Sequence, residues 1–308
     1  MASSLDEAEG AKTFTVPEDG GRLLEILRVS AGTGLPLAVH PEDFKVRKAL
    51  EAEARRENSL KAYAEAVPAE VEASAAARIL ILASLAGARI HLVHVSSRLT
   101  VNLIKLAKSL GFKFTAETCP HYLLLTVEEA ERLGAGAKID PPLKFREDCE
   151  ALWEALGEAV VDLVASDHSP HTAEEKFEAG SIWDAPAGFC GVETLLPLML
   201  TQVNFGRLSL YSLARLLSEN PAKAFGLWGV KGAVEIGFDA DLVLVDMSRE
   251  WTIKAEKLHS KSKVTPWDGW KVKGYPTLTL VRGEIVAEDG EPKGKPGWGR
   301  LVRPEAVR

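Results

Sequence analysis

Ionisable side chains follow directly after an apolar segment in the middle of the chain. Residues 160–165 are mostly small or β-branched and predict a buried strand, after which come Asp167 and two histidines. In a parallel α/β barrel, the carboxyl ends of the strands hold catalytic side chains rigidly, while the loops vary. A capping Asp at the start of a helix, with surface histidines beside it, is the structural alternative. The role of Asp167 therefore depends on what the rest of the chain brings near it.

Two more histidines lie at the ends of predicted strands. His40 follows residues 35–39, and His94 lies near the end of residues 90–95. Imidazole and carboxylate groups are the usual ligands of a catalytic zinc that activates water, and in a barrel they come from separate strands. A single histidine at a strand end is also typical of a hydrogen-bonded structural residue. The occurrence of His40, His94 and Asp167 at three strand ends favours a zinc site.

Two other histidines, His91 and His121, also lie on or after predicted strands and could be metal ligands. His91 precedes His94 by three residues, so the two side chains point to opposite faces of a strand and only one can face the barrel interior. His94, at the end of the strand, is the better candidate. His121 also follows a predicted strand, and the segment Cys119-Pro120-His121-Tyr122 fits either a ligand or a structural loop.

Strands and helices alternate along the first 230 residues, which favours parallel βαβ units. The predicted strands are residues 35–39, 90–95, 112–116 and 160–165. Residues 44–66 are rich in Lys, Arg, Glu and Ala and predict a solvated helix. From about residue 232, short strands separated by Gly, Asp and Pro turns replace the helices. We therefore expect an α/β barrel domain in residues 1–230 and a small β subdomain with a tail in residues 231–308.

Composition restricts the partners. The 308 residues include 37 Lys and Arg against 44 Asp and Glu, a formal net charge of −7, with no polybasic face, so a nucleic-acid partner is disfavoured. Three scattered cysteines indicate a reducing compartment rather than a disulfide framework or a thiolate zinc site. The polar, acidic first residues do not resemble a signal peptide, and no apolar run is long enough for a membrane span. We expect a cytoplasmic protein with a small-molecule substrate.

Four segments carry a more specific signal. They are VHPED around His40, HLVHVSS at His94, TAETCPHYLLLT at His121 and ASDHSPHT at Asp167. Further motifs follow in GFCGVETLLPLML, ENPAKAFGL, DADLVLVD and HSKSKVTPWDGWKVKG. In this order the motifs resemble the cyclic amidohydrolases, the group of dihydroorotase, allantoinase and hydantoinase, over nearly the whole chain. The resemblance implies a (β/α)8 barrel with a binuclear metal site, usually zinc, in which a bridging hydroxide attacks a cyclic amide.

The resemblance also implies a role for each matching residue. His40 and His94 match metal ligands on neighbouring strands, and Asp167 matches a metal ligand that is also the general base. Lys12 is the only lysine at a plausible strand position before His40, so it is the candidate for the carbamylated lysine that bridges the two metals. A surface lysine near the terminus is the alternative interpretation of Lys12.

The predicted substrate contacts lie further along the chain. By the same resemblance, His171 contacts the substrate, Ala187 and Gly188 belong to the loop that closes over it, and His121 is structural. Asp140 stands where relatives commonly have an Asn or Arg in contact with the substrate. A carboxylate at this position would repel an anionic substrate such as dihydroorotate.

The chain departs from the family pattern in its first part. The family carries a His-x-His pair on strand 1, followed by an Arg that binds the substrate carboxylate, and no His-x-His pair occurs here. We therefore expect an N-terminally incomplete barrel of about strands 4–8, with open sheet edges, in which the second metal lacks its histidine pair. Either the chain is truncated, or another chain completes the barrel.

Three functions agree with these observations. GVETLLPL, His171 and TPWDG favour a dihydroorotase-like enzyme, which interconverts N-carbamoyl-L-aspartate and dihydroorotate in pyrimidine biosynthesis. HVSS, ETCPHYLLL and SDHSP also fit allantoinase, so opening of an allantoin or hydantoin ring is the alternative. The third is a truncated, non-catalytic homologue that acts as an assembly partner, which the retention of His40, His94, Asp167 and His171 opposes. We also expect a homo-oligomer, or an assembly with an aspartate carbamoyltransferase.

Overall fold

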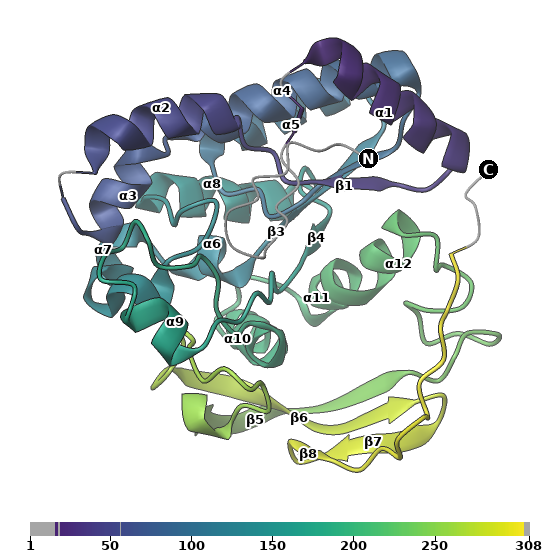
Figure 1. The fold of residues 1–308 in the computed structure, drawn as a ribbon. Helices are drawn as coiled ribbons and strands as arrows, with labels where there is room; N and C mark the ends of the chain where they lie inside the picture. The colour runs from purple at the N-terminus through teal and green to yellow at the C-terminus, as the bar shows by residue number, and fades with distance from the viewer. Residues whose placement is uncertain (1–15, 18, 56, 305–308) are drawn as a thin grey trace.

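Four short parallel strands form the central sheet (Figure 1). The computed structural model describes residues 16–17, 19–55 and 57–304, so Lys12 lies outside the described residues. The strands are β1 (Leu37–Val39), β2 (Ile90–Leu92), β3 (Phe114–Thr118) and β4 (Leu163–Val164). They pair in the order β1-β2-β3-β4, each parallel to the next. Because neighbouring strands are parallel, each connection is a crossover, here through helices, which confirms the predicted βαβ units.

Helices connect the strands and cover the sheet. Before β4 they are α1 (Gly20–Thr33), α2 (Phe44–Ala54), α3 (Leu60–Ala66), α4 (Ala69–Ala86), α5 (Arg98–Ser109), α6 (Pro120–Leu124), α7 (Val127–Ala130), the 3₁₀ helix η1 (Glu131–Ala137) and α8 (Arg146–Gly157). The single helix predicted for residues 44–66 is two helices. Ser59 separates them, because its extended backbone caps α3 and its hydroxyl accepts a hydrogen bond from the Ala62 amide at 3.0 Å.

The chain after β4 is helical before it becomes a second sheet. The helices are α9 (Ala173–Phe177), α10 (Val192–Asn204), α11 (Leu210–Ala214), the π-helix η2 (Arg215–Glu219) and α12 (Asn220–Ala224). An antiparallel sheet follows, made of β5 (Leu242–Thr252), β6 (Lys271–Val281), β7 (Glu284–Glu288) and β8 (Glu291–Pro292), with the 3₁₀ helix η3 (Ala255–Lys257) between β5 and β6. Not all strands after residue 232 are short as predicted: β5 has eleven residues, and irregularities in its pairing with β6 let it bend without ending.

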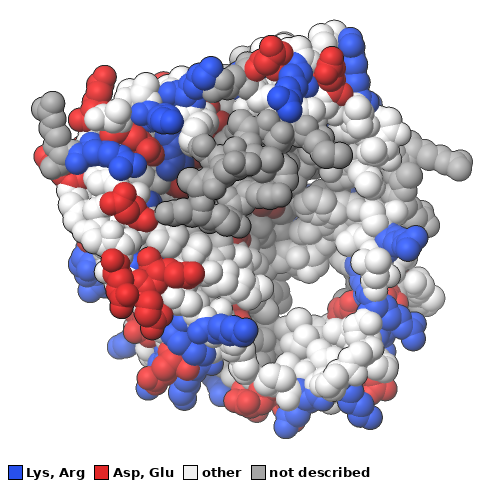
Figure 2. All heavy atoms as spheres, in the orientation of Figure 1, with Lys and Arg blue, Asp and Glu red and all other residues white. Residues whose placement is uncertain are grey.

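Close packing joins the second sheet to the helical part. Gly274 of β6 lies against α10, and a Cβ atom there would come within 2.6 Å of the Leu200 Cβ. Its φ of +107° also requires glycine. In Figure 1 the antiparallel sheet lies at the opposite side of the molecule from α1, α2 and α4. In Figure 2 acidic and basic side chains are mixed on the visible face, and a hollow opens above the second sheet. The predicted domain boundary at residue 230 stays a prediction.

The core lies between the parallel sheet and its helices. Ile90 and Leu92 of β2 are almost completely buried, and so are Ile79 of α4 and Ile104 of α5. Burial of this apolar surface fixes β2 between its neighbours. None of the helices in the described part of the chain is both long and apolar enough to cross a membrane.

We expect Leu92→Ala to lower the free energy of unfolding by about 2–5 kcal/mol, because truncation of a fully buried side chain leaves a cavity. Leu92 has 0% exposure, whereas Leu106 on α5 is 55% exposed. Leu106→Ala is therefore the control, with an expected change of about 0.5 kcal/mol or less. Urea unfolding followed by circular dichroism measures both, and equal effects would contradict the assignment of β2 to the core.

Candidate functional site

His40 and His94 meet at the carboxyl ends of β1 and β2. His40 Nδ1 and His94 Nε2 are 2.9 Å apart, and the two rings meet edge to face with centroids 4.7 Å apart. His94 has φ +41°, which is uncommon outside glycine and reorients the side chain at the end of the strand. The structure thus brings together two of the predicted metal ligands from positions 54 residues apart.

Glu42 sets the orientation of His40. The two are joined by a hydrogen bond of 2.8 Å between His40 Nε2 and Glu42 Oε2. If Nε2 carries the proton and donates it, the lone pair of Nδ1 is directed at His94. Burial opposes a charge on His40, but the hydrogen bond and the negative charge of Glu42 outweigh it and raise the pKa of His40. A carboxylate on the second ring nitrogen is the usual outer partner of a metal-binding histidine.

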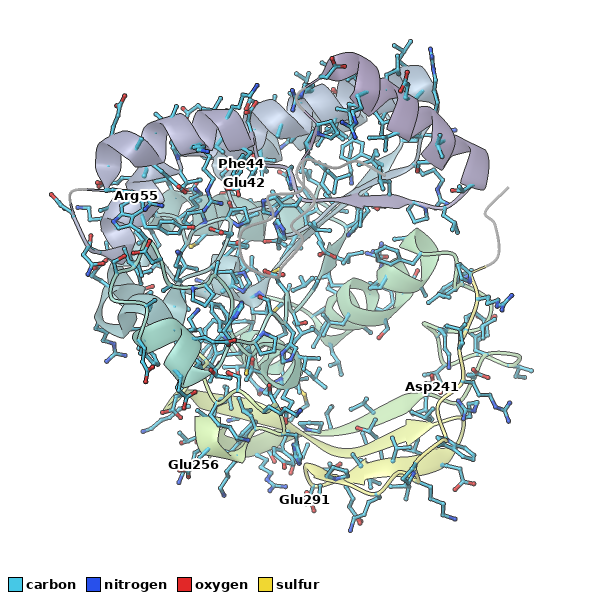
Figure 3. The ribbon with its side chains drawn as sticks, in the orientation of Figure 1. Glu42, Phe44, Arg55, Asp241, Glu256 and Glu291 are labelled. Carbon is cyan, nitrogen blue, oxygen red and sulfur yellow. The ribbon has the colours of Figure 1, made fainter. Side chains whose placement is uncertain are left out.

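Arg47 forms ion pairs with Glu42 and with two neighbouring carboxylates. Its guanidinium lies 2.7 Å from Glu42, 2.7 Å from Glu51 and 3.1 Å from Asp140. Burial would raise the pKa of Glu42, but Arg47 and His40 lower it to about 2, so Glu42 is ionised at neutral pH. Figure 3 places Glu42 beside the start of α2, the helix that carries Arg47.

Asp140 is bound by this network. Besides the contact with Arg47, its carboxylate accepts a hydrogen bond from the Tyr63 hydroxyl. The negative charge predicted to repel an anionic substrate is therefore partly neutralised by Arg47. A contact between Asp140 and a substrate stays a prediction.

Asp167 follows β4 and has φ +45°, so a second predicted ligand also has an unusual backbone conformation at a strand end. Burial raises the pKa of Asp167 to about 6, and the negative charge of Glu117 adds to this, while the charge of His40 acts in the opposite direction. Asp167 thus lies within electrostatic reach of His40. A carboxyl group with a pKa near 6 exchanges protons readily close to neutral pH.

The histidine pair fits part of a metal site. Two nitrogen ligands on a tetrahedral zinc, each at 2.0–2.1 Å, are about 3.3 Å apart, so His40 Nδ1 and His94 Nε2 need to separate by only a few tenths of an ångström. The Nδ1 atom of His94 is buried and has no hydrogen-bond partner among the described residues. In the part of the chain that the structure describes, no three His, Cys, Asp or Glu side chains converge on one metal position. His40 and His94 are together, whereas Asp167 does not complete a set of three with them.

The predicted substrate-contacting segments lie next to Asp167. His171 is one-third exposed, with its Nδ1 3.6 Å from Glu175. Gly188 has φ +124°, and a Cβ atom there would come within 2.2 Å of the Ser169 carbonyl oxygen, so only glycine permits this close approach. Ala187 and Gly188 therefore belong to a segment that lies against the residues after Asp167. Their contact with a substrate, and that of His171, stays a prediction.

His91 and His168 have hydrogen-bond partners within the fold. His91 is hydrogen-bonded through Nδ1 to Thr115 and through Nε2 to Glu117, at 2.7 and 2.9 Å. His121 is buried, and burial lowers its pKa to about 3; among the described residues its Nε2 has no hydrogen-bond partner, so its structural role stays a prediction. His168, the first of the two histidines after Asp167, accepts hydrogen bonds from two backbone amides at the start of α10 and so caps this helix.

Sequence reasoning missed Glu42, Arg47 and Tyr63. Glu42 stands two residues after His40 in the VHPED motif, and this spacing could have identified it as an outer partner. Arg47 and Tyr63 lie in residues 44–66, for which the sequence predicted a solvated helix. This prediction was wrong for these two side chains, because Tyr63 is almost completely buried and Arg47 is 14% exposed.

Comparison with known proteins identifies the family of the chain. The model of the amidohydrolase family matches residues 9–286. The chain is 39% identical over 287 residues to an L-hydantoinase of Paenarthrobacter aurescens, with 92% of this chain and 62% of the relative covered. It is 41% identical over 305 residues to an allantoinase of Rubrobacter xylanophilus, with 97% and 65% covered. It is 38% identical over 297 residues to a dihydroorotase of Geobacter sp. strain M21, with 94% and 68% covered.

A solved structure shares the fold as well. An L-hydantoinase (dihydropyrimidinase) from Arthrobacter aurescens superposes with a TM-score of 0.91 at 37% identity, and the match covers 98% of this chain and 67% of that one. This similarity confirms the predicted TIM-type α/β fold. The chain spans less than two thirds of the length of the hydantoinase and allantoinase sequences that it matches.

If His40 is a metal ligand as predicted, Glu42→Gln should weaken Zn²⁺ binding by about tenfold or more, because loss of the carboxylate leaves His40 less well oriented. Glu51→Gln is the matched control, since Glu51 also contacts Arg47. Isothermal titration with Zn²⁺ measures both variants. Equal losses of affinity would show that Arg47, rather than the His40–Glu42 bond, determines metal binding.

Asp167→Asn should stabilise the metal-free protein at pH 8 by about 2–3 kcal/mol. The pKa of Asp167 is about 6 in the folded protein and 3.8 in the unfolded chain. Between about pH 4 and about pH 6 the carboxyl group therefore ionises more readily in the unfolded chain, and the free energy of unfolding of the wild-type protein falls as the pH rises. Asn also tolerates positive φ, so the backbone is preserved. Urea unfolding in the presence of a chelator, at pH 8 and at about pH 4, measures the free energy of unfolding of the variant and of the wild type. If the difference between the two proteins is as large at pH 4 as at pH 8, the prediction is refuted.

Proposed function

The chain belongs to the amidohydrolase family, and from this membership we propose that it is a metal-dependent hydrolase of cyclic amides. The observation that carries the proposal is the convergence of His40 Nδ1 and His94 Nε2 at two parallel strand ends, with Glu42 orienting His40. Asp167 lies near enough to experience the charge of His40. Relatives named hydantoinase, allantoinase and dihydroorotase support the substrate class.

Each residue has a proposed role. His40 and His94 would hold the metal, Asp167 would be the carboxylate ligand, and Lys12 is the proposed carbamylated lysine. We propose zinc because imidazole and carboxylate are ligands that zinc prefers. When bound, the metal activates a water molecule and polarises the amide carbonyl. The carboxylate of Asp167 would accept a proton from the attacking water and return it to the departing ring nitrogen.

The first proposed substrate is dihydroorotate, in reversible exchange with N-carbamoyl-L-aspartate in the cytoplasm as a step of pyrimidine biosynthesis. GVETLLPL, TPWDG and His171 support this substrate. A neutral hydantoin or allantoin ring is the second candidate. Asp140 favours it, because this carboxylate is close enough to raise the pKa of His40 and disfavours a second negative charge nearby.

Two further proposals concern assembly. A non-catalytic role as an assembly partner is supported by the presence of only two converging ligands in the described part of the chain. A homo-oligomer, or a complex with an aspartate carbamoyltransferase, stays a prediction.

The purified chain loaded with Zn²⁺ should hydrolyse at least one of dihydroorotate, hydantoin and allantoin, and a chelator should abolish the activity. Asp167→Ala should lower kcat by about 10²–10⁴-fold, because the proton acceptor is lost. Glu150→Ala, on α8, is the control and should retain full activity. A chain with fewer than about one metal ion and no turnover of any of the three rings would support the assembly partner instead.

A further inference from the structure

Two buried lysines beside the site have no part in the proposed reaction. Lys176 is 1% exposed and Lys138 is 5% exposed. An ammonium group in the protein interior is costly unless partners replace its water shell. For both lysines the partners are backbone carbonyl oxygens, and most of these belong to residues 183–188.

Lys176 lies in a cage of three carbonyl groups. Its Nζ donates to the oxygens of Lys138 at 3.1 Å, Pro186 at 3.0 Å and Gly188. An ammonium group has three donors, so all three are used, whereas a neutral amine would direct its lone pair at a carbonyl oxygen. Burial and the charge of Lys138 lower the pKa of Lys176 to about 7, and the three carbonyl oxygens favour its charged form.

Lys138 holds the other half of the same segment. Its Nζ donates to the carbonyl oxygens of Trp183 at 3.1 Å and Ala185 at 2.6 Å. The ammonium group also lies 4.7 Å from the centre of the Tyr63 ring, a cation–π contact. Since Tyr63 donates a hydrogen bond to Asp140, Lys138 connects residues 183–188 to the network around His40.

The segment that the lysines hold is pressed against the residues after Asp167. The Gly188 amide donates to the Lys138 carbonyl oxygen at 2.9 Å, and the Ser169 amide donates to the Phe189 carbonyl oxygen at 3.2 Å. The close approach of Gly188 to Ser169 leaves no room for a side chain. The position of Ser169, two residues after Asp167, is thus coupled to the lysine-bound segment.

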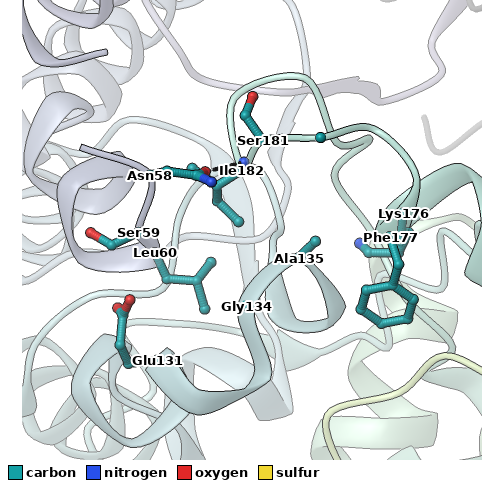
Figure 4. A pocket seen from close by; sticks show the side chains of 11 residues that line it. Asn58, Ser59, Leu60, Glu131, Gly134, Ala135, Lys176, Phe177, Ser181 and Ile182 are labelled. Atoms are coloured by element: carbon teal, nitrogen blue, oxygen red, sulfur yellow. Dashed lines mark hydrogen bonds between the residues drawn. The ribbon is translucent and has the colours of Figure 1, made fainter. Parts of the chain in front are cut away.

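A cavity lies next to Lys176. It has a volume of about 260 Å³, and its lining includes Asn58, Leu60, Phe177 and Ile182 (Figure 4). Ile182, which immediately precedes the lysine-bound residues, donates its amide to the Asn58 side chain at 2.6 Å. Space beside this part of the segment means that packing alone does not prevent its displacement. The lysine–carbonyl bonds supply the missing constraint.

We propose that Lys138 and Lys176 are positioning residues that fasten residues 183–188 onto the Asp167 segment and so determine how a cyclic amide is held there. The effect on the substrate rests on the proposed function. The fastening itself does not, and it can be measured without any substrate.

Hydrogen–deuterium exchange of the full chain tests the fastening. In Lys176→Met and in Lys138→Met, exchange at the amides of Gly188 and Ser169 should accelerate about tenfold or more, while amides of β2 keep their rates. Lys105→Met, which changes an exposed lysine on α5, is the control and should change neither region. If one lysine variant does not fold, the other carries the test. Unchanged exchange at Gly188 and Ser169 in a folded variant would overturn the proposal.

Steady-state kinetics tests the consequence for the substrate. With a ring that the wild-type chain hydrolyses, Lys176→Met should raise KM about tenfold with a smaller change in kcat and with unchanged zinc content. A purely structural role would instead reduce the active fraction, and so kcat, at constant KM, and this result would overturn the positioning role. If the wild-type chain hydrolyses no ring, the proposed function fails, and the exchange experiment still decides whether the lysines fasten the segment.

Discussion

Parallel pairing between β1 and β2 brings the carboxyl ends of the two strands side by side. Leu37 pairs with Ile90 and Val39 with Leu92, and the next residues of each strand lead to His40 and His94. A shift of one residue in this register would turn each side chain to the other face of the sheet. The register is held by the burial of Ile90 and Leu92 against the helices. The candidate site thus depends on an apolar constraint that is separate from its own polar contacts.

The carboxyl groups near the histidines occupy different environments, and these give them different protonation states. Glu42 lies against Arg47, which keeps it ionised and able to orient His40. Asp167 is partly desolvated near Glu117, so its pKa rises toward neutral. Environments that separate the pKa values of nearby acids are typical of sites that use one carboxylate to orient a group and another to transfer protons.

Contacts with neighbouring helices and loops stabilise the unusual backbone conformations of His94 and Asp167. His94 and Asp167 both have positive φ, a conformation that persists only where surrounding contacts require it. Two residues after His94, the Ser96 amide donates to the buried Glu72 carboxylate at 3.1 Å. Two residues after Asp167, Ser169 lies against Gly188, which the cage around Lys176 holds in place. Buried ionisable side chains on helices thus support both strand ends.

The sequence by itself determined the alternation of strands and helices, the motifs of the family and the identity of His40, His94 and Asp167 as candidate ligands. These signals are local, because caps, turns and apolar periodicity depend on residues a few positions apart. Only the tertiary structure decided that Arg47 meets Asp140, 93 positions away, and that Lys138 and Lys176 share one backbone segment. A charged residue on a helix carries no local sign of burial, since its partners are chosen by how the helices pack.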